Sequence, residues 1–170
     1  MYKNLREYIA RLEREGELVR VKTPVSTRFE IAEITDRMVK SEGGGKAILF
    51  ENTGTEFPVI TNMMGSKHRI AMALGVERLD DIAERIQSLL GDALSPKGSL
   101  WEKMRMLPLL ADVAKWFPQS VSGRGECQQG VWQGDEGDLE RLPMLHSWES
   151  DGGAFVTLPM VNTVDPETGM

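Results

Sequence analysis

A glycine-rich stretch followed by a strand-like segment is the part of the sequence best suited to hold a ligand. Asp151-Gly152-Gly153 precedes an apolar run in which Thr157 carries a hydroxyl group. Because paired glycines let the backbone come close to a bound molecule, this arrangement could place Thr157 beside a ligand. The same spacing fits an ordinary turn at the start of a strand, and spacing alone favours that turn.

Three further side chains could take part in catalysis or metal binding. His146 and Glu149 are close enough in sequence for an acid/base or metal-binding pair, but no third partner accompanies them, which favours a solvated loop. Cys127 could act as a nucleophile, yet only Arg124 is near in sequence to lower its pKa. One cysteine excludes an internal disulfide bond. With only His146 and His68 as histidines, at wide spacing, the chain also has a poor zinc-ligand set.

Other patterns are better explained by structure than by chemistry. Gly43-Gly44-Gly45-Lys46 lacks the spacing of a phosphate-binding loop and follows a predicted helix instead of opening one. His68, flanked by two basic residues, is predicted to lie on the surface. The methionine-rich stretch 103–110 indicates core or an interface more than a cofactor site. The residues alone therefore complete no catalytic constellation.

Composition limits the class of protein. Hydrophobic residues make up 41% of the 170 residues, enough for a folded core, and the net charge is -6. This acidity argues against a nucleic-acid-binding face, which would carry clustered Lys and Arg. There is no apolar run of about 18 residues to span a membrane and no signal-peptide pattern. We expect a cytoplasmic protein.

The first half of the chain alternates helix and strand patterns. A helix capped by Asn4 should end at Gly16, and a strand should follow at 17–21. A capping box at Thr27 and Glu30 predicts the start of a second helix, which the three glycines should end. The pattern then gives strands at 46–51 and 58–63, a helix opened by Gly65-Ser66 and another capped by Asp80 or Asp81. Alternation of this kind predicts an α/β (α+β) domain with a mixed sheet.

The pattern changes beyond residue 117. We expect an N-terminal α/β domain over residues 1–117, with a loop at 91–99 and a helical stretch at 100–117, then a linker at 118–125. Residues 126–170 should form β-structure, with strands at 127–132 and 154–164 and a turn at 134–138. A turn at 165–169 predicts a hairpin whose return strand would begin at Met170. An unpaired strand exposes its backbone groups, so we expect the chain to be a piece of a longer protein.

Five stretches, taken in order, resemble the UbiD family of decarboxylases, which includes polyprenyl-hydroxybenzoate carboxy-lyase. The resemblance spans nearly the whole chain and is weakest at 91–125. The stretches that carry it are NLREY with GELVRV at 4–8 and 16–21, EIAEITDR at 30–37, AILFEN with FPV, NMMGS and RIAMALG between 47 and 75, DLERLP at 138–143, and DGGAFVT with DPETG between 151 and 169.

This resemblance implies a fold and an activity. Family members have an N-terminal α/β domain, then a split β-barrel of flavin-binding type, of which residues 126–170 would be the first strands. They remove CO2 non-oxidatively from aromatic or α,β-unsaturated acids, using prenylated FMN with Mn²⁺. The family's metal-binding and catalytic residues follow the turn at 165–169, so the resemblance implies a fragment that lacks them, binds neither group and is inactive. Thr157 matches a position near the flavin.

Two functions follow as alternatives. In the first, the parent protein is a UbiD-type carboxy-lyase that acts on a small-molecule acid and forms a homo-oligomer at full length. In the second, the chain is an assembly or binding module attached to a plain flavin-binding split barrel. The acidic charge and the Trp- and Met-rich stretch 101–116 motivate the second alternative. The sequence identifies neither the acid nor a role in quinone biosynthesis.

Overall fold

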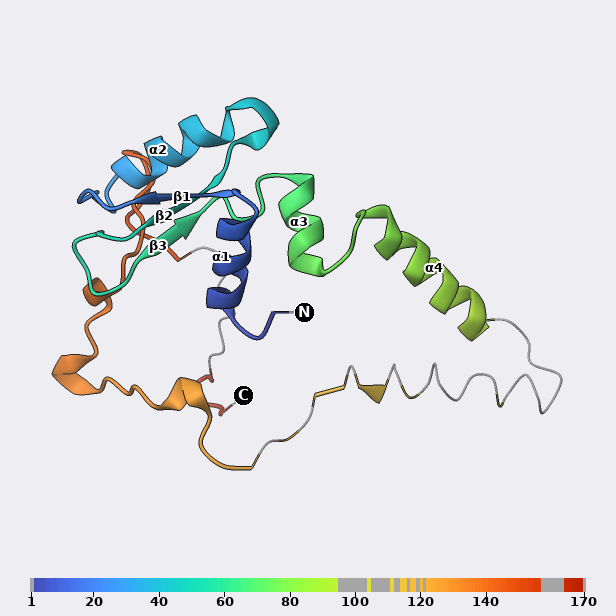
Figure 1. The fold of residues 1–170 in the computed structure, drawn as a ribbon. Coiled ribbons are helices and arrows are strands. Elements are labelled where there is room, and N and C mark those ends of the chain that lie inside the picture. The colour runs from blue at the N-terminus through green and yellow to red at the C-terminus, as the bar shows by residue number, and fades with distance from the viewer. Residues whose placement is uncertain are drawn as a thin grey trace. The chain divides into compact units, whose positions relative to one another are not determined.

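The computed structural model describes residues 2–94, 104, 111, 114–115, 117–118, 120, 122–156 and 164–169. The chain divides into two compact units, one formed by Met1–Leu79 with Asp138–Met170 and the other by Asp80–Gly137. The first unit contains a small sheet and three helices (Figure 1).

The sheet of the first unit is mixed. Its strands are β1 (Leu18–Val21), β2 (Ala47–Phe50) and β3 (Val59–Thr61), in the order β1-β2-β3. β1 pairs with β2 in parallel and β2 pairs with β3 antiparallel, with Ile48 opposite Thr61. All four residues of the central strand β2 are buried, as its continuous apolar run predicts.

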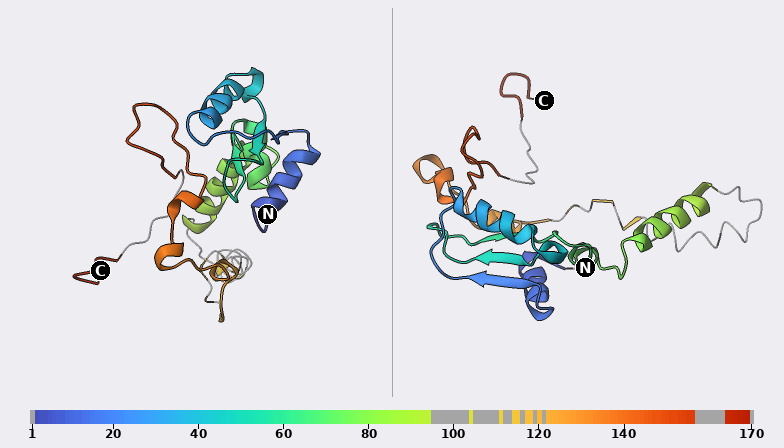
Figure 2. Two further views of the ribbon diagram at one scale, coloured as in Figure 1. Left: turned by 90° about the vertical axis from the view of Figure 1, so that its left-hand side faces the viewer. Right: turned by 90° about the horizontal axis from the view of Figure 1, so that it is seen from above.

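Two helices bury opposite faces of this sheet. α1 (Leu5–Arg14) packs Tyr8 and Leu12 around Ala47, whereas α2 (Glu30–Val39) packs Ile31 against the cluster that contains Ile48. Successive residues of a strand point to opposite faces, so Ala47 and Ile48 divide the core into two layers. Figure 1 and the right-hand view of Figure 2 show α2 running alongside the strands.

Capping residues in the sequence predict the starts of α1 and α3 correctly. The Asn4 side chain accepts a hydrogen bond from the Glu7 N–H at 3.0 Å, which confirms the predicted cap. α3 (Lys67–Leu74) begins after Ser66, whose hydroxyl accepts from the Arg69 N–H at 3.2 Å. In the second unit, α4 (Asp80–Leu94) begins close to the predicted position, but Asp80 and Asp81 lie in its first turn and not at the cap.

The predicted capping box of α2 is wrong. The helix begins at Glu30 after Phe29, which has a φ of 68°, and no side chain caps it. The Glu30 carboxylate instead accepts a hydrogen bond from the Ser26 N–H at 2.8 Å. The helix also ends at Val39, before the glycines. Gly43 and Gly44 belong to a separate 3₁₀ turn, η1 (Glu42–Gly44), and Gly45 follows it.

The predicted strand at 127–132 is also wrong. A 3₁₀ turn, η2 (Glu126–Gln128), occupies its start, and the described residues 129–132 are not in a strand. A strand needs a hydrogen-bonded neighbour, and here the Gln128 N–H donates to the Gly125 carbonyl at 3.0 Å instead. Two further 3₁₀ turns follow, η3 (Gly134–Glu136) and η4 (Leu139–Arg141).

The last part of the chain contains one short pairing and one confirmed turn. Phe155 forms an isolated antiparallel bridge with Leu145, and the rest of the predicted strand, 157–163, lies outside the described residues. Gly169 donates its N–H to the Asp165 carbonyl at 2.8 Å and has a φ of 70°, which confirms the turn. The helical prediction for 100–117 falls mostly outside the described residues, and the predicted domain boundaries stay a prediction.

Among the residues that the structure describes, no helix has both the length and the apolar character needed to cross a membrane.

Candidate functional site

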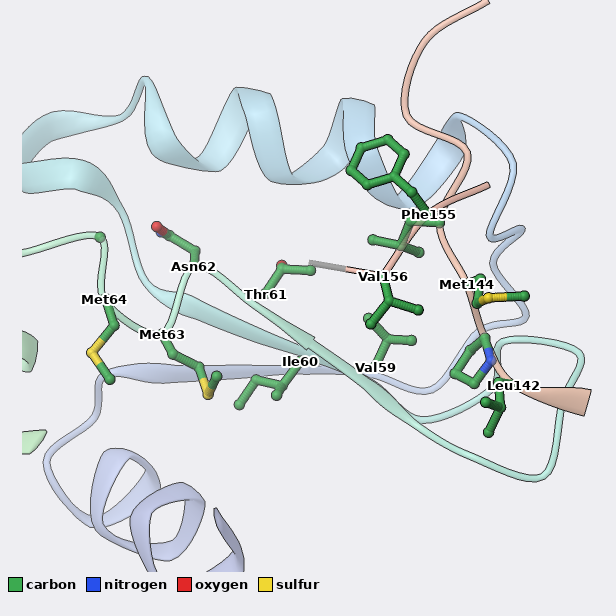
Figure 3. A pocket seen from close by; sticks show the side chains of 13 residues that line it. Val59, Ile60, Thr61, Asn62, Met63, Met64, Leu142, Met144, Phe155 and Val156 are labelled. Atoms are coloured by element: carbon green, nitrogen blue, oxygen red, sulfur yellow. The ribbon is translucent and has the colours of Figure 1, made fainter. Parts of the chain in front are cut away.

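An apolar pocket in the first unit is the main candidate for a binding site. It has a volume of about 720 Å³ and lies between β3, the turn that follows β3, and two stretches near residues 142–145 and 155–156 (Figure 3). The lining residues are Val59, Ile60, Thr61, Asn62, Met63, Met64, Gly65, Leu142, Pro143, Met144, Leu145, Phe155 and Val156. A pocket of this size suits the apolar part of a ligand or of another polypeptide segment.

The polar groups of this pocket are mostly occupied by partners. The Thr61 hydroxyl lies 2.8 Å from the Thr35 hydroxyl, and the Asn62 amide donates to the carbonyls of Gly44 and Lys46 at 2.8 and 2.9 Å. Among the residues that the structure describes, no acidic, basic or histidine side chain lines the pocket. It can therefore hold an apolar body but offers no group for proton transfer.

A tight turn, Asn62–Gly65, fixes one wall of the pocket. Asn62 has a φ of 55°, an uncommon conformation that Asn tolerates better than most residues. A Cβ atom at Gly65 would lie 1.8 Å from Asn62 Oδ1 and 2.9 Å from Arg69 Nη2. Glycine is therefore required at position 65, and the turn holds Met63 and Met64 at the pocket (Figure 3).

Arg69 lies close to Gly65 of this turn and could not be assigned from the sequence. Its side chain is 1% exposed, and Nη1 donates to Glu17 Oε2 and to the Gly45 carbonyl, both at 2.7 Å. Nε and Nη2 have no hydrogen-bond partner among the described residues. The Tyr8 hydroxyl donates to the Arg69 carbonyl at 2.9 Å, and burial, followed by the neighbouring Tyr2, raises the pKa of Tyr8.

Two of the three glycines, Gly44 and Gly45, allow close packing in this region. A Cβ at Gly44 would lie 2.2 Å from the Gly65 carbonyl oxygen, and one at Gly45 would lie 2.1 Å from the Met38 carbonyl oxygen. Both residues have positive φ. Close approach between backbones thus explains the glycines, in agreement with the rejection of a phosphate loop.

His146 attaches the second wall of the pocket to the start of α2. Its N–H donates to the Thr27 carbonyl at 3.1 Å, and its carbonyl accepts from the Phe29 N–H at 2.8 Å. The rings of Phe29 and His146 are 4.8 Å apart. His146 Nε2 is buried without a partner among the described residues. These contacts hold the segment from Leu142 to Val156 against the sheet.

The structure does not bring His146 and Glu149 together as a chemical pair. Glu149 is exposed, His146 is half-buried, and no ion pair or hydrogen bond joins them in the described part of the chain. Asp151 instead closes a turn, because its Oδ2 accepts from the Trp148 N–H at 2.9 Å. This favours the turn interpretation of the Asp-Gly-Gly stretch.

The remaining predicted site residues are placed as follows. Thr157 lies outside the described residues, although Phe155 and Val156, directly before it, line the pocket. The side chain of Cys127 also lies outside the described part. His68 is exposed, as predicted.

The described residues do not form a complete cofactor site. Across the described ranges, no three His, Cys, Asp or Glu side chains gather as metal ligands, so none is assigned to Mn²⁺. The described lining residues of the pocket include no cationic side chain to bind the phosphate of a flavin. The residues present do not fit either group by themselves, and no reaction step is derived through them.

Comparison with known proteins identifies the family of the chain. The family model for the N-terminal domain of 3-octaprenyl-4-hydroxybenzoate carboxy-lyase matches residues 9–88. The model for the Rift-related domain of the same enzyme matches residues 119–170. Together the two matches cover most of the sequence, and the chain belongs to the UbiD family.

Individual relatives are similar over nearly the whole chain. An uncharacterized protein of Aquifex aeolicus is 46% identical over 99% of this chain, which covers 34% of that protein. The chain spans about a third of the length of the curated relatives it matches.

Solved structures are similar as well. The closed form of vanillic acid decarboxylase from Sedimentibacter hydroxybenzoicus matches with a TM-score of 0.63 and 28% identity, over 91% of this chain and 29% of that chain. An evolved dimeric form of the UbiD-class enzyme HmfF from Pelotomaculum thermopropionicum, solved with prFMN, has a TM-score of 0.43 and 31% identity, covering 56% of this chain and 21% of that chain. The mixed α/β arrangement of the sheet and helices matches the UbiD N-terminal domain.

Proposed function

We propose that this chain is the N-terminal part of a UbiD-type non-oxidative decarboxylase. The observation that carries the proposal is that two models from one carboxy-lyase family match the chain in consecutive stretches, 9–88 and 119–170. An assembly or binding module attached to a plain flavin-binding split barrel would not require both models to match the chain. The parent protein would release CO2 from its substrate.

The substrate we propose is an aromatic or α,β-unsaturated carboxylic acid. The similar protein from Sedimentibacter hydroxybenzoicus acts on vanillic acid, which is aromatic. In such enzymes the bound cofactor carries the difficult chemistry, and the protein positions the substrate and sets the surrounding charge. The apolar pocket and its anchored walls would contribute support for this arrangement.

For the cofactor we propose prenylated FMN with Mn²⁺ in the full-length protein. Thr157 would contact the flavin. The other ligands would come from the portion of the relatives beyond the matched third, so the 170-residue chain alone would bind neither group and would not catalyse. In the same proposal, residues 1–117 form the α/β domain, 118–125 the linker and 126–170 the first strands of the split barrel.

A reconstitution experiment tests the proposal. The full-length protein is loaded with prenylated FMN and Mn²⁺ and supplied with a panel of benzoic, cinnamic and furoic acids, and CO2 release is measured. Release that depends on both groups supports the proposal. Retention of ordinary FMN without turnover of any acid would favour the assembly module instead.

Two further properties are proposed for the whole protein. We expect a cytoplasmic enzyme that forms homo-oligomers. Size-exclusion chromatography with light scattering on the full-length protein measures the second property directly.

A further inference from the structure

The outer edge of β3 and the apolar pocket beside it form one continuous surface. β3 pairs with β2 on one side, and no backbone hydrogen bond joins its other side to any described segment. The pocket opens along this strand, since all three of its residues line the cavity. An open strand edge next to an apolar cavity is a template for another strand.

Several apolar side chains around this surface are exposed. Met64 is 50% exposed, Phe155 47% and Val156 54%, and they surround a cavity of about 720 Å³. Three methionines, Met63, Met64 and Met144, are among the lining residues, and their flexible thioethers adapt to whatever packs on them. Covering these side chains would remove apolar area from water, which stabilises the covered state.

The lining residues also limit which kind of molecule can occupy the pocket. The described part of the lining contains no charged side chain, and the polar groups of Thr61 and Asn62 already have partners. An occupant must therefore meet the free backbone groups of β3 with backbone groups of its own and must place apolar side chains in the cavity. An extended apolar segment satisfies both conditions, whereas a charged small molecule satisfies neither.

We propose that this surface receives a β-strand from the later part of the same polypeptide. The relatives continue well beyond the matched region, since the chain covers 34% and 33% of their length, so about two thirds of each relative is available to supply the strand. The inference rests on the proposed function in one respect, that this chain is part of such a longer protein. It goes beyond that function by assigning β3 as the strand with which the added strand pairs.

Hydrogen exchange followed by mass spectrometry or NMR tests this proposal without measuring turnover. Successive N–H groups of an antiparallel strand face alternate sides, so part of Val59–Thr61 already faces β2. In the full-length protein, the amides of Val59–Thr61 that face away from β2 should exchange at least about 100-fold more slowly than in the 170-residue chain. The amides of the buried strand β2 should be slow in both proteins and report that the sheet is folded. A failed decarboxylation assay would leave this comparison unaffected.

Two substitutions and one matched control sharpen the experiment in the full-length protein. Met64→Lys and Val156→Lys place a charge where the strand would pack and should speed exchange at Val59–Thr61 by about tenfold. Val39→Lys, at a side chain 45% exposed near the end of α2 and outside the pocket, should leave it unchanged.

Three results would overturn the proposal. Slow exchange of the amides of Val59–Thr61 that face away from β2, in a monomeric 170-residue chain, would mean that its own residues cover the edge. Protection of that chain that appears only at high concentration would assign the surface to a second copy. Equal exchange at Val59–Thr61 in the full-length protein with Val156→Lys and with Val39→Lys would show that nothing packs there.

Discussion

Replacing Arg69 tests how much its buried ion pair and hydrogen bond stabilise the first unit. Arg69→Met keeps an apolar stem of similar length but removes the guanidinium that donates to Glu17 and to the Gly45 carbonyl, each at 2.7 Å. Hydrogen bonds to a charged group contribute about 1.5–3 kcal/mol each, and breaking a buried ion pair from one side costs about 3–5 kcal/mol. The side chain of Glu17 is 29% exposed and can regain water, which places the expected loss near the lower bound.

We therefore expect Arg69→Met to lower the free energy of unfolding by about 3 kcal/mol. Urea denaturation followed by far-ultraviolet circular dichroism measures it. The matched control is Arg37→Met, because Arg37 pairs with Glu33 at 2.7 Å on the surface, with side chains 78% and 50% exposed. That change should cost about 0.5 kcal/mol or less.

A double-mutant cycle separates the ion pair from general packing. Glu17→Gln combined with Arg69→Met should give a coupling energy of at least about 1 kcal/mol. The reasoning would be refuted if Arg69→Met destabilised the protein no more than Arg37→Met, or if the coupling energy were zero.

Three further predictions concern the same unit. Gly45→Ala should destabilise the protein by about 2 kcal/mol or more in urea denaturation, because a Cβ would lie 2.1 Å from the Met38 carbonyl oxygen at a φ of 59°. Tyr8→Phe removes the hydroxyl that donates to the Arg69 carbonyl and should cost about 1 kcal/mol by the same assay. The pKa of Asp165 is lowered by the backbone N–H groups that its carboxylate accepts, so NMR titration should find it below the ordinary value for Asp. The turn stabilisation from Asp165 should be present above the unfolded-state pKa and lost as the pH falls through the folded-state pKa.

Each of these has its own control. Gly16→Ala, at a φ of 70° but with open space around the new Cβ, should cost less than Gly45→Ala. Equal losses at the two glycines would contradict the steric account. Tyr2→Phe should change stability less than Tyr8→Phe, because no hydrogen bond from the Tyr2 hydroxyl is found among the described residues. An Asp165 pKa at or above its ordinary value would contradict the turn geometry.

Local signals explain why much of the fold could be predicted. Asn4 and Ser66 cap their helices with their own side chains, and the run at 47–50 is apolar at every position, so each element is specified within a few residues. The start of α2 could not be predicted in this way. Its position depends on the bridge between Arg28 and His146, which are distant in sequence.

The candidate site was harder to predict for the same reason. Glu17 and Arg69 are 52 positions apart, and a charged residue in the first turn of a helix normally indicates a surface position. The pocket joins β3 and its turn to the segment around 142–156, and only the folded chain brings these together. The family resemblance rested on ordered motifs instead of on chemistry at one site, which is why it could be stated from the sequence while the pocket could not.

The most direct test of the central claim is the release of labelled CO2 from a carboxyl-¹³C aromatic acid by the full-length protein loaded with prenylated FMN and Mn²⁺. The account predicts ¹³CO2 from the full-length protein and none from the 170-residue chain under the same conditions. Turnover by the 170-residue chain alone, or no release from any acid by the loaded full-length protein, would contradict it.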